Sequence, residues 1–243
     1  MEHELGLTAL FNDHLAGVGN AILSAVGMTA AHPARPWENW IVMEMLVVVV
    51  LMILALIIRA SLSAADPGKL QHLIESVYEM LLGLEREVGI HHPEKYVNYF
   101  GTLFIFILSM NLIGAFPAFE SPTISVVVPA GLAVCTFLYY NAMGFASNGP
   151  KYLLHFAGPV WWMAWLMIPI ELVSHLARPL SLTLRLYGNM SGGEQVTGAF
   201  LGLVHPIIPA IFMALHVFVA LLQTYVFVLL SIVYVSMATA HEH

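Results

Sequence analysis

Charged residues are scarce in this chain, and their scarcity decides its class. Only 9% of its 243 residues are Asp, Glu, Lys or Arg, whereas 59% are hydrophobic. Soluble domains carry about 25% charged residues, so the polar surface here is too small to cover a water-soluble globule. The apolar runs are long and do not alternate with polar residues, which favours membrane-spanning helices over β-barrel strands. We therefore expect an integral membrane protein.

Basic clusters and cysteine pairs are also lacking. The formal charge is −7 and no basic tract occurs, which argues against a nucleic-acid partner. The single cysteine, Cys135, cannot form an intrachain disulfide, and the apolar run around it predicts a small buried side chain. Phosphate-loop and Gly-x-Ser-x-Gly motifs are absent, so the sequence gives no sign of a nucleotide cofactor or a hydrolase centre.

The order of apolar runs and breakers predicts an all-α polytopic membrane protein with about five membrane-embedded helices and one amphipathic surface helix. An N-terminal extracytoplasmic tail (1–37) precedes a single membrane domain (38–243). Within that domain we expect spans at 38–60, 96–117 and 124–146, an amphipathic helix at 68–90, and long helices at 160–202 and 206–239. The last two would measure about 60 Å and about 48 Å. Because the hydrocarbon core is only ~30 Å thick, they should form a strongly tilted hairpin.

The helix expected at 68–90 is too charged to span the membrane. Its apolar residues share one face and its charged residues form a solvated face, as in a surface helix. The basic residues outside the spans concentrate in this link and in the turn before the long hairpin: Arg59, Lys69, Arg86, Lys95 and Lys151. The positive-inside bias places both regions in the cytoplasm. The N-terminus is then outside, and five crossings return the C-terminus to the cytoplasm.

A stripe of polar residues runs along the first long helix. Each member has another member three, four or seven positions away, so together they form one continuous polar stripe: Glu171, Ser174, His175, Arg178, Ser181, Arg185 and Asn189. An arginine at the bilayer centre costs about 2.5–3.5 kcal/mol on insertion scales, so this face must meet a partner or a watery cleft. The alternative is an Arg–Glu pair that merely holds two helices together.

A second polar group is expected on the other side of that helix. Glu194 follows Arg185 by nine positions, which is half a helical turn out of phase. On the last helix His216 and Gln223 share a face, and we expect them to meet Glu194 across the hairpin. Glutamate and histidine change protonation state, amides hydrogen-bond water, and Arg185 stays charged, so the set suits ion relay.

Residues in and around the stripe carry a family resemblance. The segment Pro179 to Glu194, with Ser181, Arg185, Asn189 and Gly193, closely resembles the signature of subunit a of F-type ATP synthases. Support extends from about Trp40 to the end of the chain and includes these stretches: Met110–Pro117, Pro169–Ser174, His216, Leu222–Phe227 and Tyr234–Ala238. The order of spans and the two long final helices are similar as well.

The resemblance implies a non-catalytic, proton-translocating stator subunit in a bacterial plasma membrane. Its partners would be a ring of c subunits, the b subunits of the peripheral stalk, the rest of the synthase and the lipid bilayer. Arg185 would be the essential arginine that separates two half-channels. Glu194, His216, Asn189 and Gln223 match the outer half-channel, and Glu171 and Ser174 match the cytoplasmic exit. Further candidates for the ion path are His175, Arg178, Ser181, Asn111 and Glu44.

The polar residues have three alternative interpretations. A standalone membrane ion transporter or channel predicts an internal repeat with paired broken helices, which we do not find. An intramembrane enzyme would need a nucleophile–base pair, but the adjacent residues Ser174 and His175 do not face each other on a helix. Glu171 with His175, or His91 with His92, could chelate a metal, but His-Glu-x-x-His and cysteine clusters are absent.

Overall fold

A computed structural model describes residues 4–25, 27, 29, 32–62, 68–90, 92–116, 119–149, 152, 164–201 and 207–239. Within these ranges all regular structure is helical, with seven α-helices and two short 3₁₀ helices. The predicted all-α class is confirmed. The five helices of the membrane domain are α2 (Asn39–Ser61), α4 (Val97–Ile113), α5 (Val127–Asn148), α7 (Ala164–Leu201) and α8 (Ile207–Thr239).

Three of the described helices, α2, α5 and α8, are long and apolar enough to cross a membrane by length and composition. Helix α4 is equally apolar but shorter, because the chain leaves helical structure at Gly114 rather than continuing to 117 as predicted. Helix α7 is one continuous element through Pro169 and Pro179. The polar stripe lowers its hydropathy, so composition alone does not identify it as a span.

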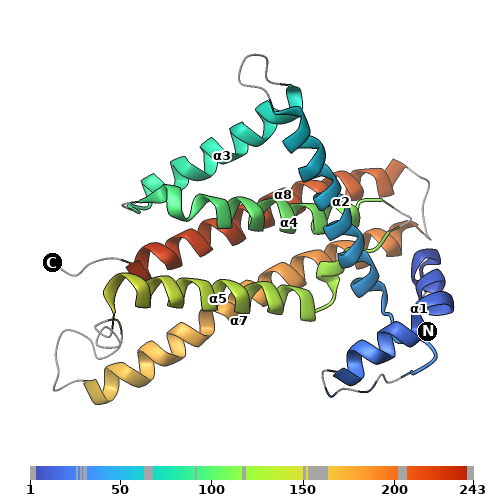
Figure 1. The fold of residues 1–243 in the computed structure, drawn as a ribbon, viewed down its shortest axis with the longest axis horizontal. Helices are drawn as coiled ribbons and strands as arrows, with labels where there is room; N and C mark the ends of the chain where they lie inside the picture. The colour runs from blue at the N-terminus through green and yellow to red at the C-terminus, as the bar shows by residue number, and fades with distance from the viewer. Residues whose placement is uncertain are drawn as a thin grey trace.

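Helices α4, α5, α7 and α8 run alongside one another in alternating directions, and α2 crosses them (Figure 1). Their shared core is made of side chains at helical spacing, such as Leu182, Leu186 and Met190 of α7 against Phe227 and Ile232 of α8. With 38 and 33 residues, α7 and α8 form the predicted long hairpin. At 1.5 Å per residue they extend about 57 Å and about 50 Å, too long to stand upright in a bilayer.

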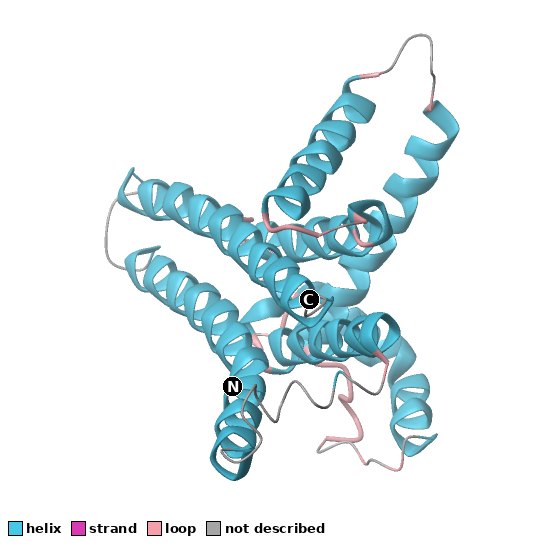
Figure 2. Cartoon of the chain, turned by 90° about the vertical axis from the view of Figure 1, so that its left-hand side faces the viewer, coloured by secondary structure: helices cyan, strands magenta, loops and turns pink. Residues whose placement is uncertain are grey.

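Helix α3 (Lys69–Glu87) projects from this bundle, as two perpendicular views show (Figures 1 and 2). Only its C-terminal half packs on the chain: Leu81 is buried, whereas Leu70 and Leu73 near its start are exposed. Its charged residues are solvated as expected, with one exception. Glu85 is completely buried, and neither carboxylate oxygen has a hydrogen-bond partner within the described part of the chain.

The buried Glu85 predicts a pH-dependent stability. Burial, and to a lesser degree the carboxylate of Glu94, raise the pKa of Glu85 from 4.5 to about 7. The folded chain therefore holds this proton more tightly than the unfolded chain, so stability falls as pH rises between about 4.5 and about 7. At pH 8 this loss in the free energy of unfolding amounts to about 3 kcal/mol. We expect Glu85→Gln to remove most of it, because glutamine does not titrate. Thermal midpoints of the purified subunit in mild detergent at pH 5 and pH 8 measure it. An equal fall in wild type and variant would contradict the assignment.

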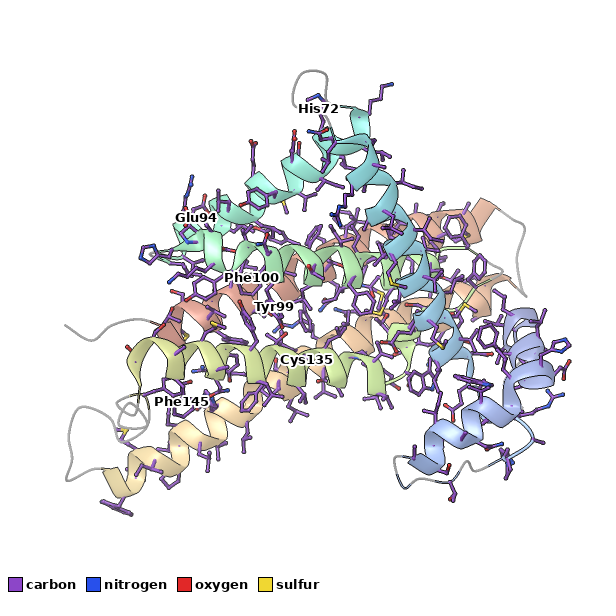
Figure 3. The ribbon with its side chains drawn as sticks, in the orientation of Figure 1. His72, Glu94, Tyr99, Phe100, Cys135 and Phe145 are labelled. Atoms are coloured by element: carbon purple, nitrogen blue, oxygen red, sulfur yellow. The ribbon has the colours of Figure 1, made fainter. Side chains whose placement is uncertain are left out.

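The prediction that Cys135 is buried is wrong. The thiol lies on the exposed side of α5 (Figure 3). In a membrane helix the outer face meets lipid, which is as apolar as a protein core, so an apolar sequence run does not tell which side chains lie inside. Glu44 is half-buried in the second turn of α2.

Candidate functional site

The half-buried carboxylate of Glu194 and the buried imidazole of His216 line one cavity of about 170 Å³. The cavity lies where α7, α8 and the loop after α4 meet, and Gly114, Ala115 and Phe119 form its third wall. Glu194 Oε2 and His216 Nε2 are both buried and have no hydrogen-bond partner within the described residues. Because an unpaired buried polar group costs about 1–3 kcal/mol, these two atoms need water, and the cavity has room for several molecules.

A second cavity, of about 320 Å³, continues along the groove between α7 and α8. His216 and Thr197 line both cavities. On the α7 side the second cavity is bordered by Gly188, Asn189 and Gly192, three residues that are exposed on the outside of the bundle. The imidazole of His216 therefore lies between the two cavities: the interior one at Glu194, and the groove that opens where Gly188 and Gly192 are exposed.

The groove is bounded by a pair of amides. Asn189 Nδ2 donates to Gln223 Oε1 at 2.7 Å, which connects the two long helices. Gln223 is almost fully buried, and its Nε2 is a third buried polar atom without a partner among the described residues. The sequence predicted that Gln223 would meet Glu194, whereas it meets Asn189. Polar atoms that need water thus occur along the whole groove.

Arg185 lies on the open side of α7. Because α7 is unbroken between Arg185 and Glu194, the two side chains point half a turn apart, as predicted. Arg185 is half-buried, and within the described part of the chain no carboxylate lies within ion-pair distance of it. Ser181, Gly188 and Gly192 on the same side are exposed. This face presents an unpaired positive charge among small residues.

The other end of the stripe is joined to α5 and α8. His175 Nε2 lies 2.9 Å from Asn141 Oδ1 and 3.2 Å from the hydroxyl of Tyr140. Arg178 pairs with Glu171 at 3.7 Å, and its guanidinium lies 5.3 Å from the centre of the Tyr234 ring. The structure therefore gives His175 and Arg178 partners that the sequence did not predict. Ser174 is exposed.

Two further candidates lie elsewhere. Asn111 is fully buried, accepts from Thr123 Oγ1 at 2.8 Å and donates to Thr224 Oγ1 at 3.2 Å, so it connects α4 and α8. Glu44 lines neither cavity. Within the described ranges no group of three His, Cys, Asp or Glu side chains is placed to hold a metal ion.

The sequence analysis missed the contribution of the loop after α4. Glu120 lies at the end of that loop, and the backbone N–H of the next residue, Ser121, donates to the Glu194 carboxylate. Thr197, which lines both cavities, was also missed. Thr197 could have been predicted, because it follows Glu194 by three positions and so shares its helical face. Loop residues such as Glu120 have no periodicity from which their position could be predicted.

Comparisons with known proteins cover most of this arrangement. Residues 41–236 match the sequence profile of the family described as ATP synthase A chain. The chain is 55% identical over 235 residues to the ATP synthase subunit a of Solibacter usitatus, which covers 96% of this chain and 100% of that relative. The subunit of the same name from Koribacter versatilis is 46% identical over 244 residues, 100% of both chains. That of Geobacter sulfurreducens is 37% identical over 212 residues, 87% of this chain and 92% of the relative.

Proposed function

This chain belongs to the ATP synthase A chain family, and from that premise we propose that it conducts protons to and from a rotating ring of c subunits through two offset half-channels. As a member of the family it is a multi-pass, non-catalytic subunit of the ATP synthase in a bacterial membrane. The chain itself makes no ATP. Its work is to let protons cross only by way of the ring.

The outer half-channel is formed by Glu194, His216, Asn189 and Gln223. The observation that carries this assignment is the row of three buried, unpartnered polar atoms on Glu194, His216 and Gln223 beside two cavities that share His216. Water that satisfies these atoms would also connect them into a proton path. A proton would pass from Glu194 through His216 into the groove that opens on the Arg185 side of α7.

Arg185 is the fixed charge at the contact with the ring. An arginine does not deprotonate in proteins, so it repels a free proton and attracts the ionised carboxylate of a passing c subunit. The unpaired state of Arg185 and the small residues around it suit a partner helix that approaches closely. A proton would pass through the groove beside Gly188 and Gly192 to the carboxylate of that helix.

The second half-channel leads from the ring to the cytoplasm past Glu171 and Ser174. The side chains of His175 and Arg178 flank the same stretch, and Arg178 holds Glu171 at 3.7 Å. In this orientation the N-terminus is outside and the C-terminus is cytoplasmic. The b subunits of the peripheral stalk would hold the chain still while the ring turns.

Gly193 gives a sharp test of the His216 position. A Cβ atom at Gly193 would come within 2.8 Å of His216 Nδ1, so Gly193→Ala must displace the imidazole. Since a misplacement of about 1 Å can cost about a hundredfold in a positioned proton transfer, we expect ATP synthesis in liposomes to fall at least about tenfold.

The matched control is Gly131→Ala on α5, where an added methyl group meets nothing within 4 Å. That variant should synthesise ATP at the wild-type rate. Both complexes should hydrolyse ATP at the wild-type rate once detergent has uncoupled hydrolysis from proton flow. A Gly193→Ala complex that synthesises ATP at the rate of the control would remove His216 from the proposed path.

A further inference from the structure

A segment that lies before the family match is hydrogen-bonded to the loop that lines the Glu194 cavity. Helix α1 (Gly6–Ala25) folds back on the start of α2. Asn12 exchanges two hydrogen bonds of 3.0 Å with the backbone of Trp37. The helix bends at Leu15, whose carbonyl oxygen accepts from Trp37 Nε1 at 2.9 Å. Gly19 packs so tightly that a Cβ there would lie 2.9 Å from Pro36 Cγ.

We call helix α1 and the segment 32–39, which these contacts hold together, the N-terminal clamp. Its hydrogen bonds extend to Glu120. The backbone N–H of Leu5 donates to Asn39 Oδ1 at 3.2 Å, and Asn39 Nδ2 donates to Glu120 Oε2 at 2.9 Å. Phe119, the neighbour of Glu120, lines the cavity. The half-buried Glu120 is thereby held between Phe119, which lines the cavity, and Ser121, whose backbone N–H donates to the Glu194 carboxylate.

We propose that Glu120 is the proton-collecting carboxylate at the entrance of the outer half-channel, and that Asn39 and the N-terminal clamp hold it in place. This inference rests on the proposed function of the Glu194 cavity. The Glu120 carboxyl gives its proton to water in the cavity, the water passes a proton to the Glu194 carboxylate, and Glu120 is reprotonated from outside. A carboxylate at a narrow mouth raises the local proton concentration by focusing its field.

The described residues hold several other titratable groups near this entrance. Glu194 and His216 face the cavity from α7 and α8. In the N-terminal clamp, Glu4 and Arg35 form an ion pair with each other, so their charges largely cancel. Glu38 is exposed and accepts a hydrogen bond from Trp40 Nε1, and Glu44 of α2 does not line the cavity. Glu120 differs from these in being hydrogen-bonded next to the residue that lines the cavity, Phe119, so we assign the collecting role to it.

The test is ATP synthesis by the whole complex in liposomes at a fixed potassium diffusion potential, with the pH on the intake side varied. Glutamine at 120 can still accept the hydrogen bond from Asn39 but cannot carry a proton. We expect Glu120→Gln to need about tenfold more protons for half its maximal rate, a shift of about one pH unit, with the maximal rate unchanged. Glu120→Asp should restore most of the wild-type pH profile. The matched control, Glu75→Gln on the exposed face of α3, should leave the profile unchanged.

Asn39→Ala separates the collecting role from simple anchoring. It leaves the carboxylate in place but removes the hydrogen bond from Asn39, so we expect a smaller shift in the same direction. If Glu120 were only an anchor, Asn39→Ala would impair synthesis at every pH and Glu120→Gln would not. A wild-type pH profile in Glu120→Gln overturns the inference. If that variant does not assemble, an unchanged profile in Asn39→Ala overturns it instead. Failure of the proposed function would be distinct, because Glu194→Gln would then synthesise ATP normally.

Discussion

Arg185→Ala should abolish ATP-driven proton pumping while the complex still assembles and hydrolyses ATP. The guanidinium is an unpaired fixed charge on the open face of α7, because no carboxylate of the described chain lies within ion-pair distance of it, whereas Arg178 is paired with Glu171. Removing a preorganised charge of this kind typically costs about a hundredfold or more. Without it, protons reach both half-channels without turning the ring. Acidification of inverted membrane vesicles, followed with a pH-sensitive dye, measures the loss.

The matched control is Arg59→Ala, which removes an exposed arginine from the last turn of α2. Its pumping should equal that of the wild type. Pumping at the wild-type rate by Arg185→Ala would show that the arginine only holds helices together, which is the alternative that the sequence left open.

Glu194→Gln should block proton flow in both directions. Its carboxylate has one buried oxygen and lines the cavity that it shares with His216, and the amide that replaces it cannot take up and release a proton. Groups that transfer protons contribute about a hundredfold or more, so synthesis should fall by at least that factor at every intake pH. The rate of ATP synthesis in liposomes, with vesicles of wild-type complex in parallel, measures the effect.

A pH-independent loss distinguishes Glu194 from Glu120, for which only the pH dependence should change. Glu79→Gln makes the same chemical change elsewhere: Glu79 lies on the exposed face of α3 and lines neither cavity. That change should leave synthesis within about twofold of the wild type, as surface substitutions usually do. Glu194→Gln at wild-type rates would require another route for the proton.

The spacing of polar residues predicted much of this site because helical periodicity fixes which side chains share a face. It placed Arg185 and Glu194 half a turn apart on one long helix. It also predicted that residues of α8 would complete the site across the hairpin, although Gln223 contacts Asn189 and not Glu194. Such inferences need only a continuous helix, and α7 is continuous.

Contacts that depend on loops or on packing between distant helices were not predictable in this way. The loop that carries Glu120 lies beside Glu194 because the short 3₁₀ helix after it, Pro122–Ile124, packs on α7. His175 turns toward Tyr140 and Asn141, a contact set by how α5 packs on α7. Glu85 is buried because only one end of α3 docks on the bundle. Cys135 faces outward because apolar residues suit both the core and the lipid.

The central claim is that protons pass from the Glu194 cavity to the groove on the Arg185 side of α7, and that the charge of Arg185 keeps them from crossing directly to the second half-channel. The most direct test is the passive proton leak of assembled complexes in liposomes without ATP, for Arg185→Ala and for Arg185→Ala combined with Glu194→Gln. The Arg185→Ala variant should leak protons. The double variant should leak no more than the wild type, because the leaking protons must pass Glu194. A leak of equal size in both variants would show that protons reach Arg185 by another path, and would contradict the account.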